Sequence, residues 1–140
     1  MIRYGCVCGL LVLLLCAGCG PSNNPHFEKT TPVRGKLTWA NGSPVRGGLI
    51  TLHPKDVTKG ESRGTIDREG RFTLGTYKVT DGVMPGQYVA TVEPIVYDQR
   101  GNMRRDRSLG IPPKYADTQS SDLTVEIKDE ESQELNLLLR

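Results

Sequence analysis

The chain has 140 residues and a mass of 15.4 kDa, which suffices for one domain and argues against a multidomain enzyme. Its composition, 36% hydrophobic and 24% charged with a mean hydropathy of -0.39, fits neither a membrane-embedded bundle nor a disordered polyelectrolyte. The 18 Lys and Arg against 16 Asp and Glu leave a net charge of +2, too little for the concentrated positive field of a nucleic-acid-binding protein.

Residues 1–18 have the features of an export signal. Arg3 supplies a positive start, and the uncharged run from Cys6 to Gly18 follows it. A helix needs about 20 apolar residues to cross a bilayer, and this run is shorter. We therefore expect a signal helix over residues 1–18 rather than a permanent transmembrane span.

Two small residues and a thiol, Ala17, Gly18 and Cys19, end this run. They resemble the lipobox of bacterial lipoproteins, although Cys16 stands where that family prefers leucine. The resemblance implies that the chain is cut before Cys19 and that the Cys19 sulfur carries a diacylglycerol with acyl chains such as palmitate. At about 0.8 kcal/mol per buried methylene, two long chains make a stable membrane anchor. The alternative is an ordinary secretory signal cut nearby, with Cys19 incidental.

Residues 19–31 are expected to comprise the lipidated cysteine and a flexible tether, because the sequence after Cys19 is polar, contains two prolines and shows no periodicity. Gly20 stands where an aspartate favours inner-membrane retention in well-studied Gram-negative lipoproteins. The resemblance therefore implies a lipid-anchored protein of the cell envelope, in the outer membrane rather than the inner one.

All four cysteines lie in or at the end of the signal: Cys6, Cys8, Cys16 and Cys19. The exported domain therefore has no disulfide, no cysteine-bound metal and no cysteine nucleophile. Its stability must come from a hydrophobic core.

From Pro32 onward, brief apolar runs separated by turn residues such as Asn41-Gly42 predict strands, and no window sustains the 3.6-residue period of a helix. We expect strands over residues 33–39, 50–52, 63–66, 71–74, 88–92, 123–127 and 135–139. Their spacing and single apolar faces predict an all-β fold, a seven-stranded antiparallel β-sandwich over residues 32–140.

Three connections complete this prediction. Asp67 to Gly70 is typical of a tight turn, since Asp bonds the backbone two residues on and Gly supplies a positive φ. We expect this turn to close a hairpin between 63–66 and 71–74, and the last two strands to pair around residues 129–132. Residues 94–121 form a long, charged connection without an assigned element.

The inward side chains of the seven strands predict the core. They are Val33, Leu37, Trp39, Ile50, Leu52, Ile66, Phe72, Leu74, Tyr88, Ala90, Val92, Leu123, Val125, Ile127, Leu135, Leu137 and Leu139.

Four segments, in order along the chain, carry a family resemblance: VRGKLTWANGSPVRGGLITLHP, TIDREGRFTL, MPGQYVATV, and IPPKYAD followed by LTVEI. They are similar to the carboxypeptidase regulatory-like, transthyretin-like domains of bacterial surface lipoproteins. The resemblance implies a prealbumin-like or Ig-like sandwich with an accessory or binding role and no catalysis of its own.

Catalytic and metal-binding motifs are not found in the sequence. His26 and His53 are the only histidines, and neither belongs to an H-E-x-x-H motif. Asp67 and Glu69 beside Gly70 lack the repeated acids of a calcium loop, and no G-x-S-x-G elbow is present. We therefore expect no metal, no cofactor and no enzymatic activity.

The connection 94–121 holds the candidate ligand-binding residues: Arg100, Arg104, Arg105, Arg107 and Tyr115. Guanidinium groups bind carboxylates and phosphates in paired geometry, so the arginines could contact lipid headgroups or acidic glycans. Asp98 and Asp106 are interleaved with them, which favours a solvated loop instead. Tyr115 could stack on a ligand or pin the loop to the core.

The sequence thus favours a non-enzymatic, lipid-anchored accessory or interaction module of the cell envelope. Its expected partners are the membrane, through Cys19, and an envelope protein or glycan, but no nucleic acid. The alternative is an envelope enzyme or ligand-delivery subunit that uses residues 94–121 on glycans or other acidic ligands.

Overall fold

The computed structural model describes residues 27–140, so the predicted signal helix, the lipidation at Cys19 and the first part of the tether lie outside the described residues. The strands are β1 (Val33–Trp39), β2 (Leu49–Pro54), β3 (Ser62–Thr65), β4 (Arg71–Leu74), β5 (Gly86–Glu93), β6 (Ile95–Tyr97), β7 (Met103–Arg105), β8 (Thr124–Ile127) and β9 (Gln133–Leu139). Two short 3-10 helices, η1 (Arg107–Leu109) and η2 (Pro113–Ala116), lie between β7 and β8. No helix within residues 27–140 is long and apolar enough to cross a membrane.

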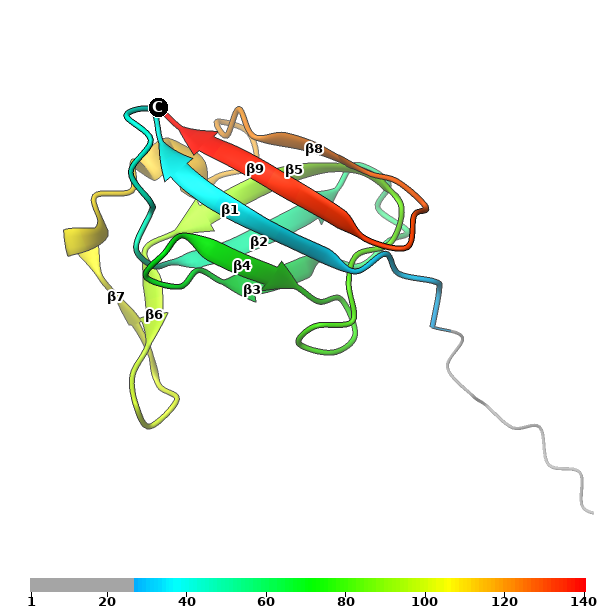
Figure 1. Cartoon of the computed structure of the whole chain (residues 1–140), viewed down its shortest axis with the longest axis horizontal. Coiled ribbons are helices and arrows are strands. Elements are labelled where there is room, and N and C mark those ends of the chain that lie inside the picture. Colours follow the sequence, from blue (N-terminus) through cyan, green and yellow to red (C-terminus); the bar gives the residue numbers. More distant parts are fainter. Residues whose placement is uncertain (1–26) are drawn as a thin grey trace, which may run out of the picture.

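Two sheets face each other across one core (Figure 1). One has the strand order β4-β1-β9 and the other the order β3-β2-β5-β8. Alternate residues of each strand point inward, because successive side chains of a strand lie on opposite faces of the sheet. The all-β sandwich predicted from the sequence is confirmed.

The core contains nearly all the predicted side chains. Trp39 and Leu137 are only partly buried, and the other predicted positions are buried. Loop residues complete the core where no strand was expected: Val45, Val83, Met84, Ile111 and Tyr115.

The sandwich is not wholly antiparallel, which corrects the prediction. β9 pairs in parallel with β1, placing Leu135 beside Gly35, whereas β8 pairs antiparallel with β5. The last two strands therefore belong to different sheets and do not form the expected pair. The turn around residues 129–132 therefore crosses from one sheet to the other. As a result, β8 and β9 bury their apolar faces against the same core from opposite sides.

The hairpin expected around Asp67 is also corrected. The turn itself forms, with Asp67 Oδ1 accepting from the N–H groups of Glu69 at 2.9 Å and Arg71 at 2.8 Å. However, β3 pairs with β2 and β4 pairs with β1, so the two strands separate into opposite sheets.

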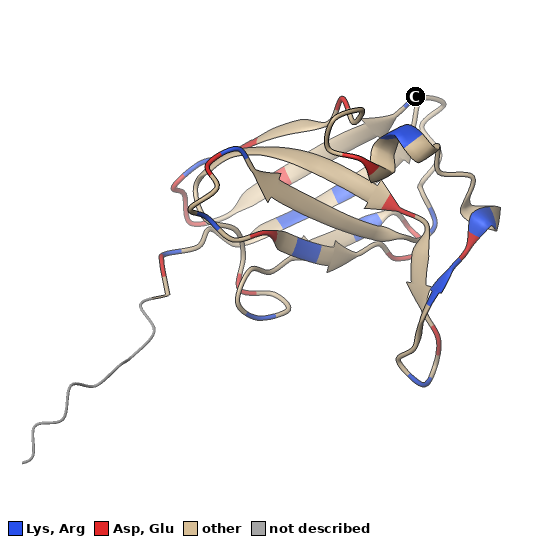
Figure 2. Cartoon of the chain, turned by 180° about the vertical axis from the view of Figure 1, so that it is seen from behind, with Lys and Arg blue, Asp and Glu red and all other residues tan. Residues whose placement is uncertain are grey.

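Residues 94–121, for which no element was expected, contain the β6-β7 hairpin and both 3-10 helices. Asp98 Oδ1 accepts from the N–H groups of Arg100 at 2.8 Å and Asn102 at 2.9 Å, and Gly101 has a φ of 80°. The hairpin projects from the end of the sandwich opposite to the end where the N-terminal segment enters (Figures 1 and 2).

Residues 27–31 pack against the sandwich. Thr31 is fully buried and exchanges two backbone hydrogen bonds with Val83, at 2.8 and 2.9 Å. The rings of Phe27 and Tyr77 lie 4.7 Å apart, and Lys29 Nζ lies 2.7 Å from a carboxylate oxygen of Asp129. The contacts of the folded body thus extend upstream of Pro32.

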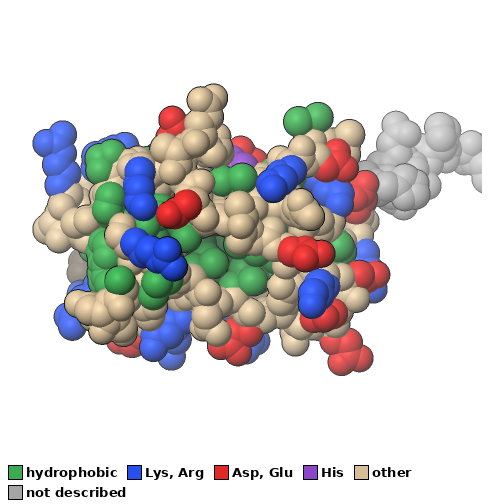
Figure 3. All heavy atoms as spheres, turned by 90° about the horizontal axis from the view of Figure 1, so that it is seen from above, with side chains coloured by type: hydrophobic (Ala, Val, Ile, Leu, Met, Phe, Trp, Pro, Cys, Tyr) green, Lys and Arg blue, Asp and Glu red, His purple; other side chains and the backbone are tan. Residues whose placement is uncertain are grey.

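The side of the molecule that carries β8 and β9 in Figure 1 has hydrophobic side chains at its surface. Seen from above, hydrophobic side chains lie in a strip that charged side chains surround (Figure 3). The Gln133 side chain joins the two strands at one end, accepting from the N–H of Lys128 at 2.9 Å and donating to the carbonyl of Glu126 at 2.8 Å.

Candidate functional site: a basic groove beside β3 and β4

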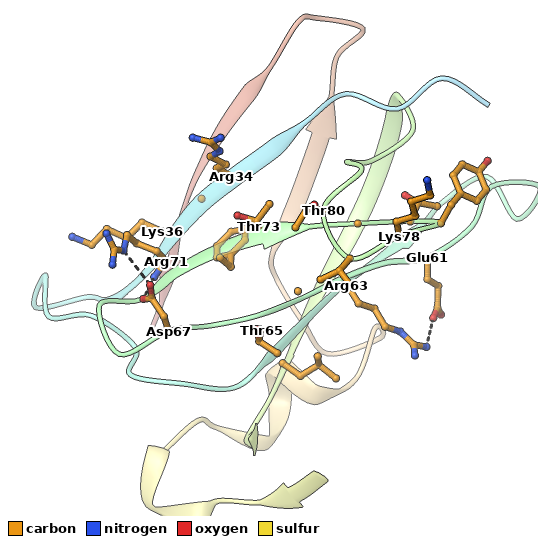
Figure 4. A pocket seen from close by; sticks show the side chains of 18 of the residues that line it. Arg34, Lys36, Glu61, Arg63, Thr65, Asp67, Arg71, Thr73, Lys78 and Thr80 are labelled. Atoms are coloured by element: carbon orange, nitrogen blue, oxygen red, sulfur yellow. Dashed lines mark hydrogen bonds and ion pairs between the residues drawn. The ribbon is translucent and has the colours of Figure 1, made fainter. Parts of the chain in front are cut away.

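An open groove with a volume of about 1250 Å³ runs along the side of the sandwich where β3 and β4 meet (Figure 4). Its walls are the outer side chains of β1 and β4, the part of β3 that faces β4, and the loop that follows β4. Its lining residues include Arg34, Lys36, Arg63, Thr65, Thr73 and Lys78.

The separation of β3 and β4 into different sheets creates this groove. Backbone hydrogen bonds join them at Arg63 and Gly75, at 2.9 and 3.0 Å, and the turn adds one from the Asp67 N–H to the Arg71 carbonyl at 2.9 Å. Thr65 and Thr73 lie between these places, and no backbone hydrogen bond is formed there among the described residues. The facing edges of β3 and β4 are therefore joined by hydrogen bonds at both ends.

Positive charge gathers around the groove. Arg34 and Lys36 alternate on the outer face of β1, and Lys78 lies in the loop on the other side of Thr73 (Figure 4). Within residues 27–140, none of these three cations forms an ion pair.

The carboxylates at the groove are mostly paired. Arg63 Nη2 lies 2.8 Å from Glu61 Oε2, and Arg71 Nε lies 3.1 Å from Asp67 Oδ2. Glu134 also lines the groove, opposite Arg34 in the β1-β9 register. The surplus positive charge makes the groove suitable for an anionic ligand.

A second hollow, of about 340 Å³, lies beside the groove on the outer face of the β3-β2-β5-β8 sheet and shares Glu61, Arg63 and Tyr97 with it. His53 Nε2 lies 2.9 Å from Thr91 Oγ1, and His53 Nδ1 lies 2.8 Å from Glu61 Oε1.

The Thr91 hydroxyl, the His53 imidazole and the Glu61 carboxylate are linked in the same order as the nucleophile, base and acid of a hydrolase triad. Thr91, however, is buried in β5, and this strand pairs with β2 on one side and β8 on the other. Thr91 lies opposite Thr51 in the ladder that joins β5 to β2. We therefore interpret the network as a brace between β2, β5 and the start of β3.

Aspartates organise many of the turns. A carboxylate oxygen accepts from the N–H two residues later at each of these positions: Asp56, Asp67, Asp98, Asp106 and Asp117. These acids stabilise local structure rather than converge on a point. In the part of the chain that the structure describes, no three His, Cys, Asp or Glu residues are grouped so as to hold a metal ion.

Several of these hydrogen bonds change the acidity of the carboxyls. The Ser108 hydroxyl and N–H lower the pKa of Asp106, and the Thr58 hydroxyl and N–H lower the pKa of Asp56. Burial acts to raise the pKa of Asp67, but the N–H groups of Arg71 and Glu69 and the Arg71 guanidinium together outweigh it, so this pKa is also lowered.

These lowered pKa values predict a loss of stability in acid. A carboxyl whose pKa is lower in the folded than in the unfolded state contributes stability above its unfolded pKa, about 4, and loses it as the pH falls through the folded pKa. The melting temperature should therefore fall between about pH 4 and pH 2. Circular dichroism melts across this range test it, and Asp67→Asn should show a shallower fall. A melting temperature that rises on acidification would contradict it.

The predicted arginines lie outside the groove. Arg104 and Arg105 are consecutive on β7 and so point to opposite faces, Arg100 is in the hairpin turn, and Arg107 is in η1. All four are exposed, and Arg104 Nη2 lies 3.4 Å from a carboxylate oxygen of Asp106. The structure places them on one projection without directing them into one pocket.

Tyr115 is fully buried in η2. Its hydroxyl accepts from the Arg140 N–H at 2.7 Å and donates to the Arg140 carbonyl at 3.1 Å. The side chain thus pins the long connection to the end of β9, and its ring offers no stacking face to a ligand. Of the two roles considered from the sequence, packing is the one that this position serves.

No family model and no curated protein matches the chain. Among solved structures, it is similar to the major pilin subunit BcpA of Bacillus cereus, with 14% identity, a TM-score of 0.45, and coverage of 79% of this chain and 29% of the pilin. It is also similar to a 9R-lipoxygenase from Cyanothece PCC8801, with 12% identity, a TM-score of 0.42, and coverage of 79% and 16%. The chain thus spans less than a third of either protein. The resemblance to carboxypeptidase regulatory-like domains stays a prediction.

Proposed function

We propose that this chain is a non-enzymatic, lipid-anchored interaction module of the cell envelope. The observation that carries the proposal is the placement of the β6-β7 hairpin and the N-terminal segment at opposite ends of the sandwich (Figures 1 and 2). An anchor at Cys19 would hold one end near the membrane and leave the hairpin facing away from it.

The contacts of residues 27–31 support this orientation. They attach the N-terminal segment to the loop after β4 and to Asp129, so the chain leaves the sandwich in a defined direction. The free tether between Cys19 and Phe27 would have an end-to-end distance of roughly 15 Å. A lipid at Cys19 would therefore keep the body close to the bilayer.

The composition of the hairpin suits a protein partner. Besides Arg100, Arg104 and Arg105, it exposes Tyr97 at 48% and Met103 at 62%. Tyr, Met and Arg are enriched in protein interfaces, and Arg and Tyr also among the residues that dominate binding energy. The hairpin is therefore suited to bind an acidic surface on an envelope protein.

The experiment is a pull-down from envelope extracts with the Arg104→Ala/Arg105→Ala variant. We expect roughly tenfold weaker capture of the partner at low salt, with the difference shrinking as salt is raised. The variant Arg46→Ala/Lys128→Ala, which removes two exposed cations elsewhere, is the charge-matched control. Equal capture by the hairpin variant and the wild type would indicate that these arginines belong to a solvated loop without a role in binding.

A ligand-delivery subunit is the second candidate function, and the basic groove favours it. In this role the sandwich would hold a small or polymeric ligand at its side while the hairpin contacts a partner. The two roles use different cations, so they can be tested separately.

A further inference from the structure

We propose that the groove beside β3 and β4 binds an extended acidic polysaccharide that carries carboxylate groups. This inference rests on the proposed function in one respect, namely that the folded body faces the envelope. Its binding chemistry comes from the groove, to which Tyr97 of β6 contributes, and does not depend on the hairpin arginines.

Cations without an ion-pair partner among the described residues lie on both sides of Thr73 (Figure 4). Arg34 and Lys36 lie on one side of Thr73, and Lys78 lies on the other side of it (Figure 4). Since these three cations form no ion pair within residues 27–140, they can meet acidic groups that are spaced along a ligand. A single small anion would reach only one end of the groove.

The floor of the groove favours a sugar chain. Thr65, Thr73 and Thr80 line it, and within residues 27–140 their side-chain hydroxyls form no hydrogen bond. Tyr97, with 48% of its surface exposed, also lines the groove, as does Tyr77, which is 39% exposed and packs its ring against Phe27. Free hydroxyls and aromatic faces together suit the alternating polar and apolar surfaces of a sugar ring.

The geometry disfavours a peptide that adds as a strand. The edges of β3 and β4 bond to each other at Arg63 and Gly75, and the turn closes the far end. Between these places, the space that a side chain at Gly64 would need is already filled by the carbonyl of Thr73. An added strand would lack a free edge to pair with, so the ligand must lie over the groove.

The test uses the full chain, purified in detergent, with polygalacturonate as the probe and uncharged dextran as the comparison. Affinity electrophoresis measures the dissociation constants. The wild type should bind polygalacturonate but not dextran, more weakly at high salt. Binding should weaken about tenfold or more in Arg34→Ala/Lys36→Ala/Lys78→Ala.

Two further variants separate the explanations. Arg46→Ala/Lys55→Ala/Lys128→Ala removes the same charge from exposed positions outside the groove and should bind nearly as the wild type does. Arg104→Ala/Arg105→Ala should also retain binding, so that loss of the partner and loss of the polysaccharide are distinct results. Because all the substituted residues are exposed, thermal melting should confirm that each variant folds.

Several results would overturn the inference. They are no binding to polygalacturonate, equal binding to dextran, or equal loss in the groove variant and its charge-matched control. Loss only in the hairpin variant would also overturn it while leaving the hairpin proposal intact. Groove-dependent binding to anionic lipid vesicles, without binding to polygalacturonate, would assign the groove to headgroups instead.

Discussion

Replacing Gly35 with alanine should lower the free energy of unfolding by about 3 kcal/mol. Gly35 faces the core from the middle of β1, in register with Phe72 of β4 and Leu135 of β9. A Cβ at this position would overlap the Phe72 ring and lie 2.6 Å from the Leu135 carbonyl oxygen. The ring could turn aside, but the carbonyl belongs to the adjacent strand, so the sheet itself would have to shift.

Denaturant titration and thermal melting measure this effect, and the melting temperature should drop by roughly 12 to 20 °C. Gly42→Ala is the matched control, because Gly42 has a φ of 85° but nothing within 4 Å of its added Cβ. It should cost only about 1 kcal/mol of backbone strain. Equal losses of unfolding free energy in the two variants would show that close packing around Gly35 is not the reason why alanine is unfavourable at this position.

Replacing Cys19 with serine should move the protein from the membrane fraction to the soluble fraction. If two acyl chains hold the molecule, their gross insertion free energy is on the order of 20 kcal/mol, which no contact of a small sandwich with the surface would replace. Metabolic labelling with radioactive fatty acid, followed by fractionation, measures both the lipid and the location.

Cys16→Ser is the control for this experiment, since it changes a neighbouring thiol of the same run and should leave labelling and membrane retention intact. Unchanged labelling of the Cys19→Ser variant would refute anchoring at this residue. Loss of labelling in both variants would point to failed processing rather than to the anchor.

Most strands of the two main sheets could be predicted from the sequence because they have one apolar face. In β1, Val33 and Leu37 alternate with exposed Arg34 and Lys36, and this pattern fixes which face is buried. The pairing of strands is not contained in such a pattern. A turn such as Asp67 to Gly70 reverses the chain whether the next strand stays in the sheet or crosses to the other layer.

Local signals also explain what was missed between residues 94 and 121. Asp98 to Gly101 repeats the D-x-x-G pattern of Asp67 to Gly70, and both turns use the same carboxylate hydrogen bonds. The pattern could therefore have predicted the β6-β7 hairpin. By contrast, Ile111 and Tyr115 are core residues in irregular segments, where no periodicity marks the buried side.

The candidate site was harder to predict than the fold. In the sequence, Arg34 and Lys36 have the pattern of an ordinary polar strand face. They line a groove only because β3 and β4 lie in different sheets. His53 and Glu61 meet because β2 and β3 are adjacent, and Thr91 joins them from β5. No short motif encodes either arrangement.

The proposal of an anchored envelope module is tested most directly by the mass of the N-terminal peptide of the protein purified from membranes. Trypsin should release a peptide that ends at Lys29. We expect this peptide to begin at Cys19 and to carry the added mass of a diacylglycerol. An unmodified peptide, or one that begins at another residue, would contradict the anchor on which the proposed orientation depends.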